Sequence, residues 1–356
     1  MVLGYTVEGF REKDNGVEIL LKDNPSLQAD MVVLAIGVTP DTALAKEAGL
    51  ELGIKGSIVV NDRMETSVPD IYAAGDAVQV KHYVTGDDAL ISLAGPANKQ
   101  GRIIADNICG GDSHYLGSQG SSVIKVFDMT AATTGINETN AKKSGLEVDT
   151  VILSPMSHAG YYPGGKVMTM KVVFEKETYR LLGAQIIGYE GVDKRIDVLA
   201  TAIHAGLKAT QLKDLDLAYA PPYSSAKDPV NMAGFMIDNI AKGTLKQWHL
   251  EDMDKISKDK NVVLLDVRTV GEFNRGHMKG FNNIPVDELR ERISEIEKGK
   301  PVYLICQSGL RSYIASRILE GNGYETYNFS GGFRFYDTVV NDRALIERAY
   351  ACGMDY

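Results

Sequence analysis

Short apolar runs separated by turn residues fill the first part of the chain and predict strands. Residues 4–10 and 17–21 flank the turn 14–16, which reads Asp-Asn-Gly. Because Asn-Gly is a preferred tight turn between two strands, this segment predicts an antiparallel hairpin. The continuously apolar residues 31–36 predict a buried parallel strand. Further along, we expect a helix over residues 42–48 and short strands over residues 57–62 and 71–74.

Near the other end of the chain, an apolar run leads directly into a cysteine. Residues 301–305 predict a buried strand, and residues 312–319 have the pattern of a helix. Cys306 would lie in the tight loop between them, where N–H groups at the start of the helix favour negative charge. Arg311 adds to this field, so we expect an ionised sulfur that solvent and substrates can reach. The alternative is an inert cysteine buried at the end of a strand.

The pattern Cys-x-x-Gly-x-Arg-Ser that begins at Cys306 resembles the active loop of single-domain rhodaneses, which carry sulfane sulfur as a cysteine persulfide. The resemblance extends over about residues 247–345, and a loop of six residues, Cys306 to Arg311, implies sulfur rather than phosphate or arsenate as the substrate. It assigns catalysis to Cys306 and Arg311, and the persulfide loop to Gln307, Ser308, Gly309, Leu310 and Ser312.

A second informative segment places a carboxylate after a short apolar run. Asp76 follows Gly75 at the expected carboxyl end of the strand over residues 71–74. Ligands of open α/β sheets bind at this end, and a carboxylate there can accept hydrogen bonds from a polyol. The alternative is an aspartate that caps a helix.

Residues 35–40, 73–77 and 95–102 resemble successive motifs of the flavin-dependent pyridine-nucleotide disulfide oxidoreductases, and residues 123–230 resemble the dimerisation domain of that family. The order of these segments, followed by a rhodanese, resembles the subgroup that reduces coenzyme A disulfides or persulfides. The resemblance places the flavin against Gly75, Asp76, Ala77, Gly95, Pro96 and Ala97.

The same resemblance singles out Tyr161 and Tyr219, which match positions where the subgroup places hydroxyl groups near a mixed disulfide, across the dimer interface. A phenol in a dry site can stabilise a developing thiolate by hydrogen bonding. Packing at the interface is the alternative role, and Tyr162 and Tyr223 are alternative positions for the two hydroxyls.

These resemblances imply a multidomain chain of α/β and α+β class. Residues 1–44 would be the remnant of an NAD-binding domain, and residues 45–115 the C-terminal part of an FAD-binding domain. Residues 118–240 would be an α+β dimerisation domain, through which the protein forms a homodimer. Residues 247–356 would be a rhodanese-like α/β domain with a parallel sheet.

The sequence contains no Gly-x-Gly-x-x-Gly turn, the element that holds a dinucleotide pyrophosphate. We therefore expect the C-terminal part of a longer reductase, with its redox cysteine outside this chain. Cys109 does not replace that cysteine, because it lies at the expected end of a helix. FAD binding by the chain alone is expected to be weak or absent, whereas the intact enzyme would use FAD, NAD(P)H and coenzyme A.

Composition narrows the remaining options. The chain has 356 residues and a net charge of −9, so it lacks the excess of basic residues that binds nucleic acid or an anionic membrane surface. No apolar run approaches the roughly 20 residues of a membrane helix. The three cysteines form no Cys-x-x-Cys and the six histidines form no ligand-spaced cluster, so we expect no metal. A reducing cytoplasm fits these features.

The sequence thus predicts part of a FAD- and NAD(P)H-dependent coenzyme A-disulfide or persulfide reductase with a fused rhodanese that transfers sulfur through Cys306. Two alternatives stay open: a fragment of an NADH oxidase-like flavoenzyme, and a rhodanese module that docks a partner without catalysis.

Overall fold

The chain divides into two compact units, one formed by residues 1–39 with residues 337–356 and the other by residues 40–336. The computed structural model describes residues 4–351, with side chains described as far as residue 342.

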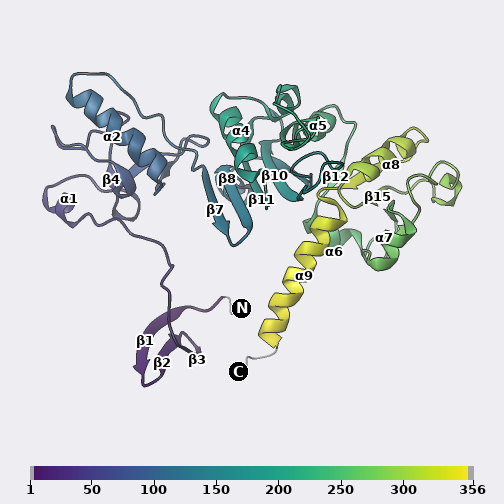
Figure 1. Cartoon of the computed structure of the whole chain (residues 1–356), viewed down its shortest axis with the longest axis horizontal. Coiled ribbons are helices and arrows are strands. Elements are labelled where there is room, and N and C mark those ends of the chain that lie inside the picture. The colour runs from purple at the N-terminus through teal and green to yellow at the C-terminus, as the bar shows by residue number, and fades with distance from the viewer. Residues whose placement is uncertain (1–3, 352–356) are drawn as a thin grey trace. The chain divides into compact units, whose positions relative to one another are not determined.

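The first unit contains a three-stranded antiparallel sheet in the order β1-β2-β3, drawn in purple in Figure 1. Its strands are β1 (Val7–Lys13), β2 (Gly16–Leu21) and β3 (Asn24–Ala29). Lys13 pairs with Gly16 across the turn between β1 and β2, which confirms the predicted hairpin. The third strand extends the hairpin through a second antiparallel pairing.

The predicted strand over residues 31–36 is wrong. The segment is irregular and its apolar side chains are exposed, with Ile36 at 88%. An apolar run becomes a buried strand only where neighbouring strands take up its backbone hydrogen bonds and cover its faces. No strand in the described part of the chain pairs with these residues.

The second unit begins with a small sheet in the order β4-β5-β6. Its strands are β4 (Ile58–Val59), β5 (Val78–Lys81) and β6 (Asp88–Ala89), and its helices are α1 (Ala43–Glu47), α2 (Ala94–Ile108) and the short 3-10 turns η1 (Ile54–Gly56) and η2 (Gly75–Ala77). Residues 71–74, which we expected to form a strand, make only an isolated bridge through Tyr72. The ladder instead begins at Val78, directly after η2.

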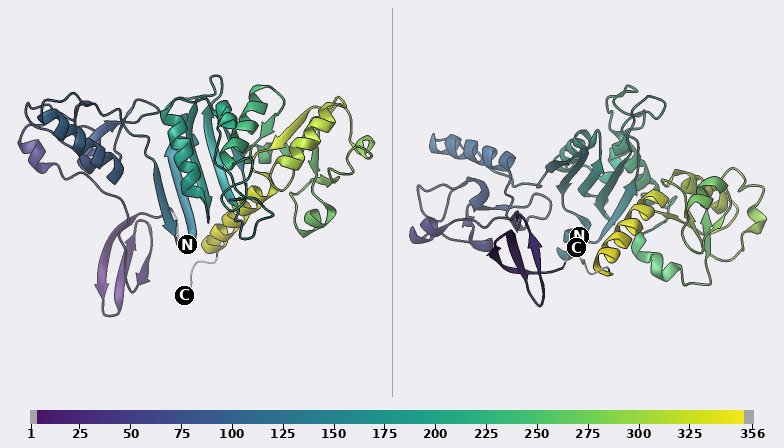
Figure 2. Two further views of the ribbon diagram at one scale, coloured as in Figure 1. Left: turned by 45° about the horizontal axis from the view of Figure 1, so that its top comes forward. Right: turned by 60° about the horizontal axis from the view of Figure 1, so that its bottom comes forward.

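A five-stranded antiparallel sheet follows, in the order β7-β8-β11-β10-β9. Its strands are β7 (Ser122–Val126), β8 (Met129–Gly135), β9 (Val148–Leu153), β10 (Met168–Glu175) and β11 (Leu181–Gly188). The helices of this region are α3 (Glu138–Lys143), α4 (Val192–His204), η3 (Ala209–Asp214) and α5 (Pro229–Ala241). Buried side chains of the central strands and of α4 and α5 form one apolar core, and Figure 2 shows α4 lying along the strands.

The last sheet is parallel throughout, in the order β12-β16-β15-β13-β14, as predicted for this region. Its strands are β12 (Gln247–Trp248), β13 (Val263–Asp266), β14 (Asn282–Asn283), β15 (Val302–Ile305) and β16 (Thr326–Phe329). Its helices are η4 (Leu250–Asp252), α6 (Met253–Ile256), α7 (Val270–Arg275), η5 (Ile293–Glu295), α8 (Leu310–Glu320) and the start of α9 (Gly332–Ala351). Leu304 and Ile305 of β15 are fully buried, so this strand fixes where the following loop begins.

Candidate functional site

The loop after β15 has the arrangement that the sequence predicts. Cys306 directly follows the buried strand, and α8 begins at Leu310. Gly309 caps the helix with a left-handed backbone, at φ 99°, which a residue without Cβ adopts at little cost. The turn is tight because the chain reverses from strand to helix within a few residues. It brings the backbone N–H of Gly309, the N-cap residue, to the cysteine.

Two donors point at the sulfur of Cys306. The backbone N–H of Gly309 lies 3.1 Å from Sγ, and the Ser312 hydroxyl lies 3.2 Å from it. Both contacts favour a negatively charged sulfur. Cys306 is only 1% exposed, however, which is contrary to the open thiol that the sequence led us to expect. Because Cys306 is almost fully covered, access to its sulfur requires the loop to move.

Arg311 is paired with a carboxylate rather than with the sulfur. Its two terminal nitrogens donate to the two oxygens of Glu272, each at 2.7 Å. These hydrogen bonds from Arg311 lower the pKa of Glu272 to about 2, although partial burial acts in the opposite direction. Glu272 also caps α7 together with Thr269, so one carboxylate holds both the helix and the guanidinium.

A buried ion pair supports the loop that carries Cys306. Arg268 and Asp266 are both almost fully buried and bind each other at 2.7 Å. Arg268 also donates to the carbonyl oxygen of Gly276 at 2.7 Å and lies 3.8 Å from the ring centroid of Phe333. It reaches the Gln307 side chain at 3.4 Å, which links the pair to the loop.

The two segments expected to meet a flavin lie together in the structure. The backbone N–H of Gly75 donates to the side chain of Gln100 on α2, at 2.7 Å. A Cβ on Gly75 would lie 4.0 Å from that of Ala97, in the first turn of α2. Asp76 is exposed beside them. No side chain caps the N-terminus of α2, so its first N–H groups stay open to an acceptor.

The remaining residues of these segments, Ala77, Gly95 and Pro96, belong to η2 and to the start of α2. An exposed carboxylate beside an uncapped helix N-terminus fits the hydroxyl groups and the ring edge of a flavin.

Tyr161 and Tyr219 meet in the structure. Their hydroxyl oxygens lie 2.7 Å apart, and both side chains are exposed. Hydrogen bonding with Tyr161 raises the pKa of Tyr219. The two alternative positions, Tyr162 and Tyr223, are also exposed. Tyr162 packs edge-on against His158, whereas Tyr223 accepts a hydrogen bond from Arg195 at its carbonyl oxygen.

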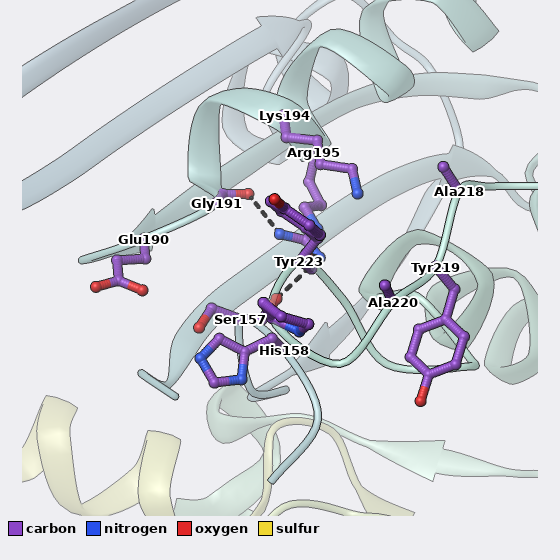
Figure 3. Close-up of a pocket in the computed structure, with 11 residues that line it drawn as sticks. Ser157, His158, Glu190, Gly191, Lys194, Arg195, Ala218, Tyr219, Ala220 and Tyr223 are labelled. Carbon is purple, nitrogen blue, oxygen red and sulfur yellow. Dashed lines mark hydrogen bonds between the residues drawn. The ribbon is translucent and has the colours of Figure 1, made fainter. Parts of the chain in front are cut away.

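A cavity of about 510 Å³ opens beside this tyrosine pair, shown in Figure 3. Its lining includes Tyr219, Tyr223, His158, Lys194 and Arg195. Arg195 is buried and is held by Asp228 at 2.9 Å.

Sequence reasoning missed the Arg195–Asp228 pair. Asp228-Pro229 is a typical start of a helix and indicates Asp228 as a cap, but no local pattern links it to Arg195, 33 residues earlier.

The other cysteines add no second redox site within the described residues. Cys109 is exposed at the C-terminal cap of α2, and Cys352 lies outside the residues that the structure describes. In residues 4–342, no three histidine, cysteine or acidic side chains gather as metal ligands would. Among the helices described, none combines the length and apolar character needed to cross a bilayer.

Comparisons with known proteins match three successive parts of the chain. Residues 1–101 match the pyridine nucleotide-disulphide oxidoreductase family, and residues 121–229 match its dimerisation domain. Residues 249–337 match the rhodanese-like domain. The chain belongs to the pyridine nucleotide-disulphide oxidoreductases and carries a rhodanese-like domain.

Two solved structures match nearly the whole of this chain. The reduced Bacillus anthracis CoADR-RHD is 47% identical with a TM-score of 0.91, and the match covers 95% of this chain and 60% of that one. A NAD-dependent persulfide reductase from A. fulgidus is 40% identical with a TM-score of 0.85, covering 93% of this chain and 60% of that one.

Among curated proteins, the NAD(P)H sulfur oxidoreductase (CoA-dependent) of Pyrococcus abyssi is 39% identical over 219 residues, which are 62% of this chain and 49% of the relative. The chain thus spans about half the length of the curated relatives it matches.

Proposed function

We propose that the protein acts as part of a FAD- and NAD(P)H-dependent coenzyme A-disulfide or persulfide reductase and transfers sulfane sulfur through Cys306. The observation that carries this proposal is the pair of donors, Gly309 N–H and Ser312 hydroxyl, that converge on a cysteine between a buried strand and a helix. A domain that only docks a partner does not need hydrogen-bond donors directed at a cysteine sulfur. The names of the relatives, which include CoA-dependent sulfur oxidoreductase and persulfide reductase, support the substrate class.

In the proposed reaction, the thiolate of Cys306 attacks the outer sulfur of a donor such as thiosulfate. The sulfur–sulfur bond of the donor breaks, sulfite leaves with the bonding electrons, and a persulfide anion forms on Cys306. The Gly309 N–H and the Ser312 hydroxyl stabilise the anion, and Arg311 contributes positive charge from its place beside Glu272. A nucleophilic acceptor, such as cyanide in an assay or the thiolate of coenzyme A, then takes the outer sulfur and restores the thiolate.

The flavin, when bound, supplies electrons from the nicotinamide to a disulfide. Asp76 would accept hydrogen bonds from its ribitol, and the N-terminus of α2 at Gly95-Pro96-Ala97 would face its ring. Because the sequence has no Gly-x-Gly-x-x-Gly turn, FAD binding by this chain alone is proposed to be weak or absent. A stoichiometric flavin absorption band after reconstitution and gel filtration would contradict this part.

The proposed organisation keeps the boundaries given by the sequence: NAD-binding remnant 1–44, FAD-binding part 45–115, dimerisation domain 118–240 and rhodanese domain 247–356. A homodimer through residues 118–240 would place Tyr161 and Tyr219 of one subunit near the mixed disulfide of the other, where the paired hydroxyls can stabilise a leaving thiolate. A cytoplasmic location is part of the same proposal.

The test is thiosulfate:cyanide sulfur transfer by the purified chain. Cys306→Ser is expected to abolish thiocyanate formation, whereas Cys109→Ser, which alters an exposed cysteine far along the sequence, is expected to leave the rate unchanged. Full activity in Cys306→Ser, with native circular dichroism, would refute the proposed role of Cys306.

A further inference from the structure

Strand β9 is one of the two outer strands of the five-stranded sheet, and one N–H on its free edge donates to a serine far away in the sequence. The backbone N–H of Ile152 donates to the hydroxyl oxygen of Ser330, at 3.1 Å. Ser330 follows β16 of the parallel sheet and is only 2% exposed. The hydrogen bond therefore joins two separate sheets at a buried point, where a donor left without an acceptor is costly.

The two residues after Ser330 lead directly to the sulfur loop. Gly332 has a left-handed backbone, at φ 69°, and a Cβ there would come within 2.7 Å of the backbone of Gln307 and Ser308. Immediately afterwards, the N–H of Phe333 donates to the carbonyl oxygen of Cys306 at 2.8 Å. Residues 330–333 thus contact both elements. Ser330 binds the edge of β9, whereas Gly332 and Phe333 contact the cysteine loop.

Further contacts keep this turn fixed against β9. The N–H of Ser330 donates to the carbonyl oxygen of Trp248 in β12, at 3.0 Å. Next to Trp248, the Gln247 side chain donates to the carbonyl oxygen of Thr150 at 2.8 Å. The backbone of Ser330 is therefore bound to β12, and β12 in turn is bound to β9. The hydroxyl of Ser330 points at the edge of β9.

We propose that Ser330 is a positioning residue, which couples the Cys306 loop to the edge of β9 and so keeps the sulfur closed within its loop. This coupling concerns the sulfur-transfer role of Cys306, so its expected effect on activity rests on that proposed function. Its structural part, a loop that opens when the serine hydroxyl is lost, can be tested without any turnover.

The experiment compares Ser330→Ala with Ser316→Ala in the full chain. Ser316 has the same 2% exposure but donates to the carbonyl oxygen of Tyr313 within α8, away from β9 and from the loop turn. Each variant is examined for alkylation of Cys306 by iodoacetamide, for amide hydrogen exchange in peptides covering residues 148–153 and 305–312, and for kcat and KM in thiosulfate:cyanide transfer.

Ser330→Ala is expected to accelerate alkylation of Cys306 and exchange in both peptides by about tenfold, because one buried donor loses its acceptor. It is also expected to lower kcat with KM for thiosulfate unchanged, because a loosened loop holds the Gly309 and Ser312 donors less firmly against the reacting sulfur. Ser330→Thr, which keeps the hydroxyl, is expected to restore wild-type values, and Ser316→Ala is expected to match the wild type in alkylation and in the 148–153 peptide.

Faster exchange in residues 148–153 with unchanged alkylation of Cys306 would overturn the coupling, as would equal effects of Ser316→Ala. If Ser330→Ala is too unstable to purify, Ser330→Cys, nearly the same size but a weak acceptor, gives the same comparison by exchange alone. Absence of sulfur transfer in the wild type would refute the proposed function and leave the exchange result to decide on the coupling.

Discussion

Replacing Glu272 with glutamine is expected to free the guanidinium of Arg311 toward the sulfur loop. In the structure, two hydrogen bonds of 2.7 Å occupy both terminal nitrogens of Arg311, and the carboxylate offsets its charge. Glu272→Gln preserves the shape of the side chain but removes that negative charge. The positive field at Cys306 therefore increases, and alkylation of its thiol is expected to accelerate at neutral pH.

Glu272→Gln is also expected to lower the free energy of unfolding, and the magnitude follows from the Arg311–Glu272 pair. A pKa lowered from 4.5 to about 2 corresponds, taken at face value, to about 3 kcal/mol. The side chains of Arg311 and Glu272 are 31% and 21% exposed, so solvent screens the pair and about 1 kcal/mol is the expected loss. Because the folded-state pKa of Glu272 is lowered, this stabilisation is complete above the unfolded value of 4.5 and disappears as the pH falls toward 2.

The only tryptophan of the sequence, Trp248, is buried in the parallel-sheet domain and reports its unfolding by fluorescence. Urea titrations at pH 7 are expected to show the loss of about 1 kcal/mol in Glu272→Gln, and the difference is expected to narrow below pH 4. Alkylation rates between pH 5 and pH 9 provide the second measurement. Identical alkylation profiles for the wild type and Glu272→Gln would refute the idea that Glu272 restrains the field of Arg311.

Three further substitutions test other parts of the site. Ser312→Ala removes one of the two donors to Cys306 and is expected to lower the rate of sulfur transfer about tenfold, measured as thiocyanate release. Gly309→Ala places a Cβ at φ 99° with no steric neighbour within 4 Å, so the backbone alone is expected to cost about 1 kcal/mol by urea titration of Trp248 fluorescence. Asp228→Asn leaves the charge of Arg195 buried without its partner and is expected to destabilise the chain by about 3 kcal/mol, seen as a lower midpoint in thermal circular dichroism.

The local elements of the sulfur loop could be predicted because they are encoded within a few residues. An apolar run, a cysteine and a glycine before a helical pattern specify the strand, the turn and the helix of residues 302–320. The partner of Arg311 could not be predicted in this way, since Glu272 lies 39 residues earlier. The sequence Thr269-x-x-Glu272 indicates the start of a helix, but only the fold shows that the same carboxylate also binds Arg311.

The run over residues 31–36 illustrates the opposite case, in which a strong local pattern fails. Its composition satisfies every local requirement of a buried strand, but strand formation depends on neighbours that hydrogen-bond to its edges. The tyrosine pair is a third case: the resemblance selected Tyr161 and Tyr219, 58 residues apart, and the fold adds that their hydroxyls bind each other.

The contacts of Arg311 and Cys306 decide which groups stabilise a negative charge on the sulfur. A free arginine would stabilise an ionised sulfur through its net charge, which mobile salt screens. Glu272 offsets most of the charge of Arg311, so the direct contacts to the sulfur come from the Gly309 N–H and the Ser312 hydroxyl, two fixed dipoles at a buried atom, and Arg311 adds a smaller contribution. Buried dipoles act at short range and are screened little. It follows that added salt between 0.05 M and 0.5 M is expected to change the alkylation rate of Cys306 little in the wild type and more in Glu272→Gln, where a net charge is exposed.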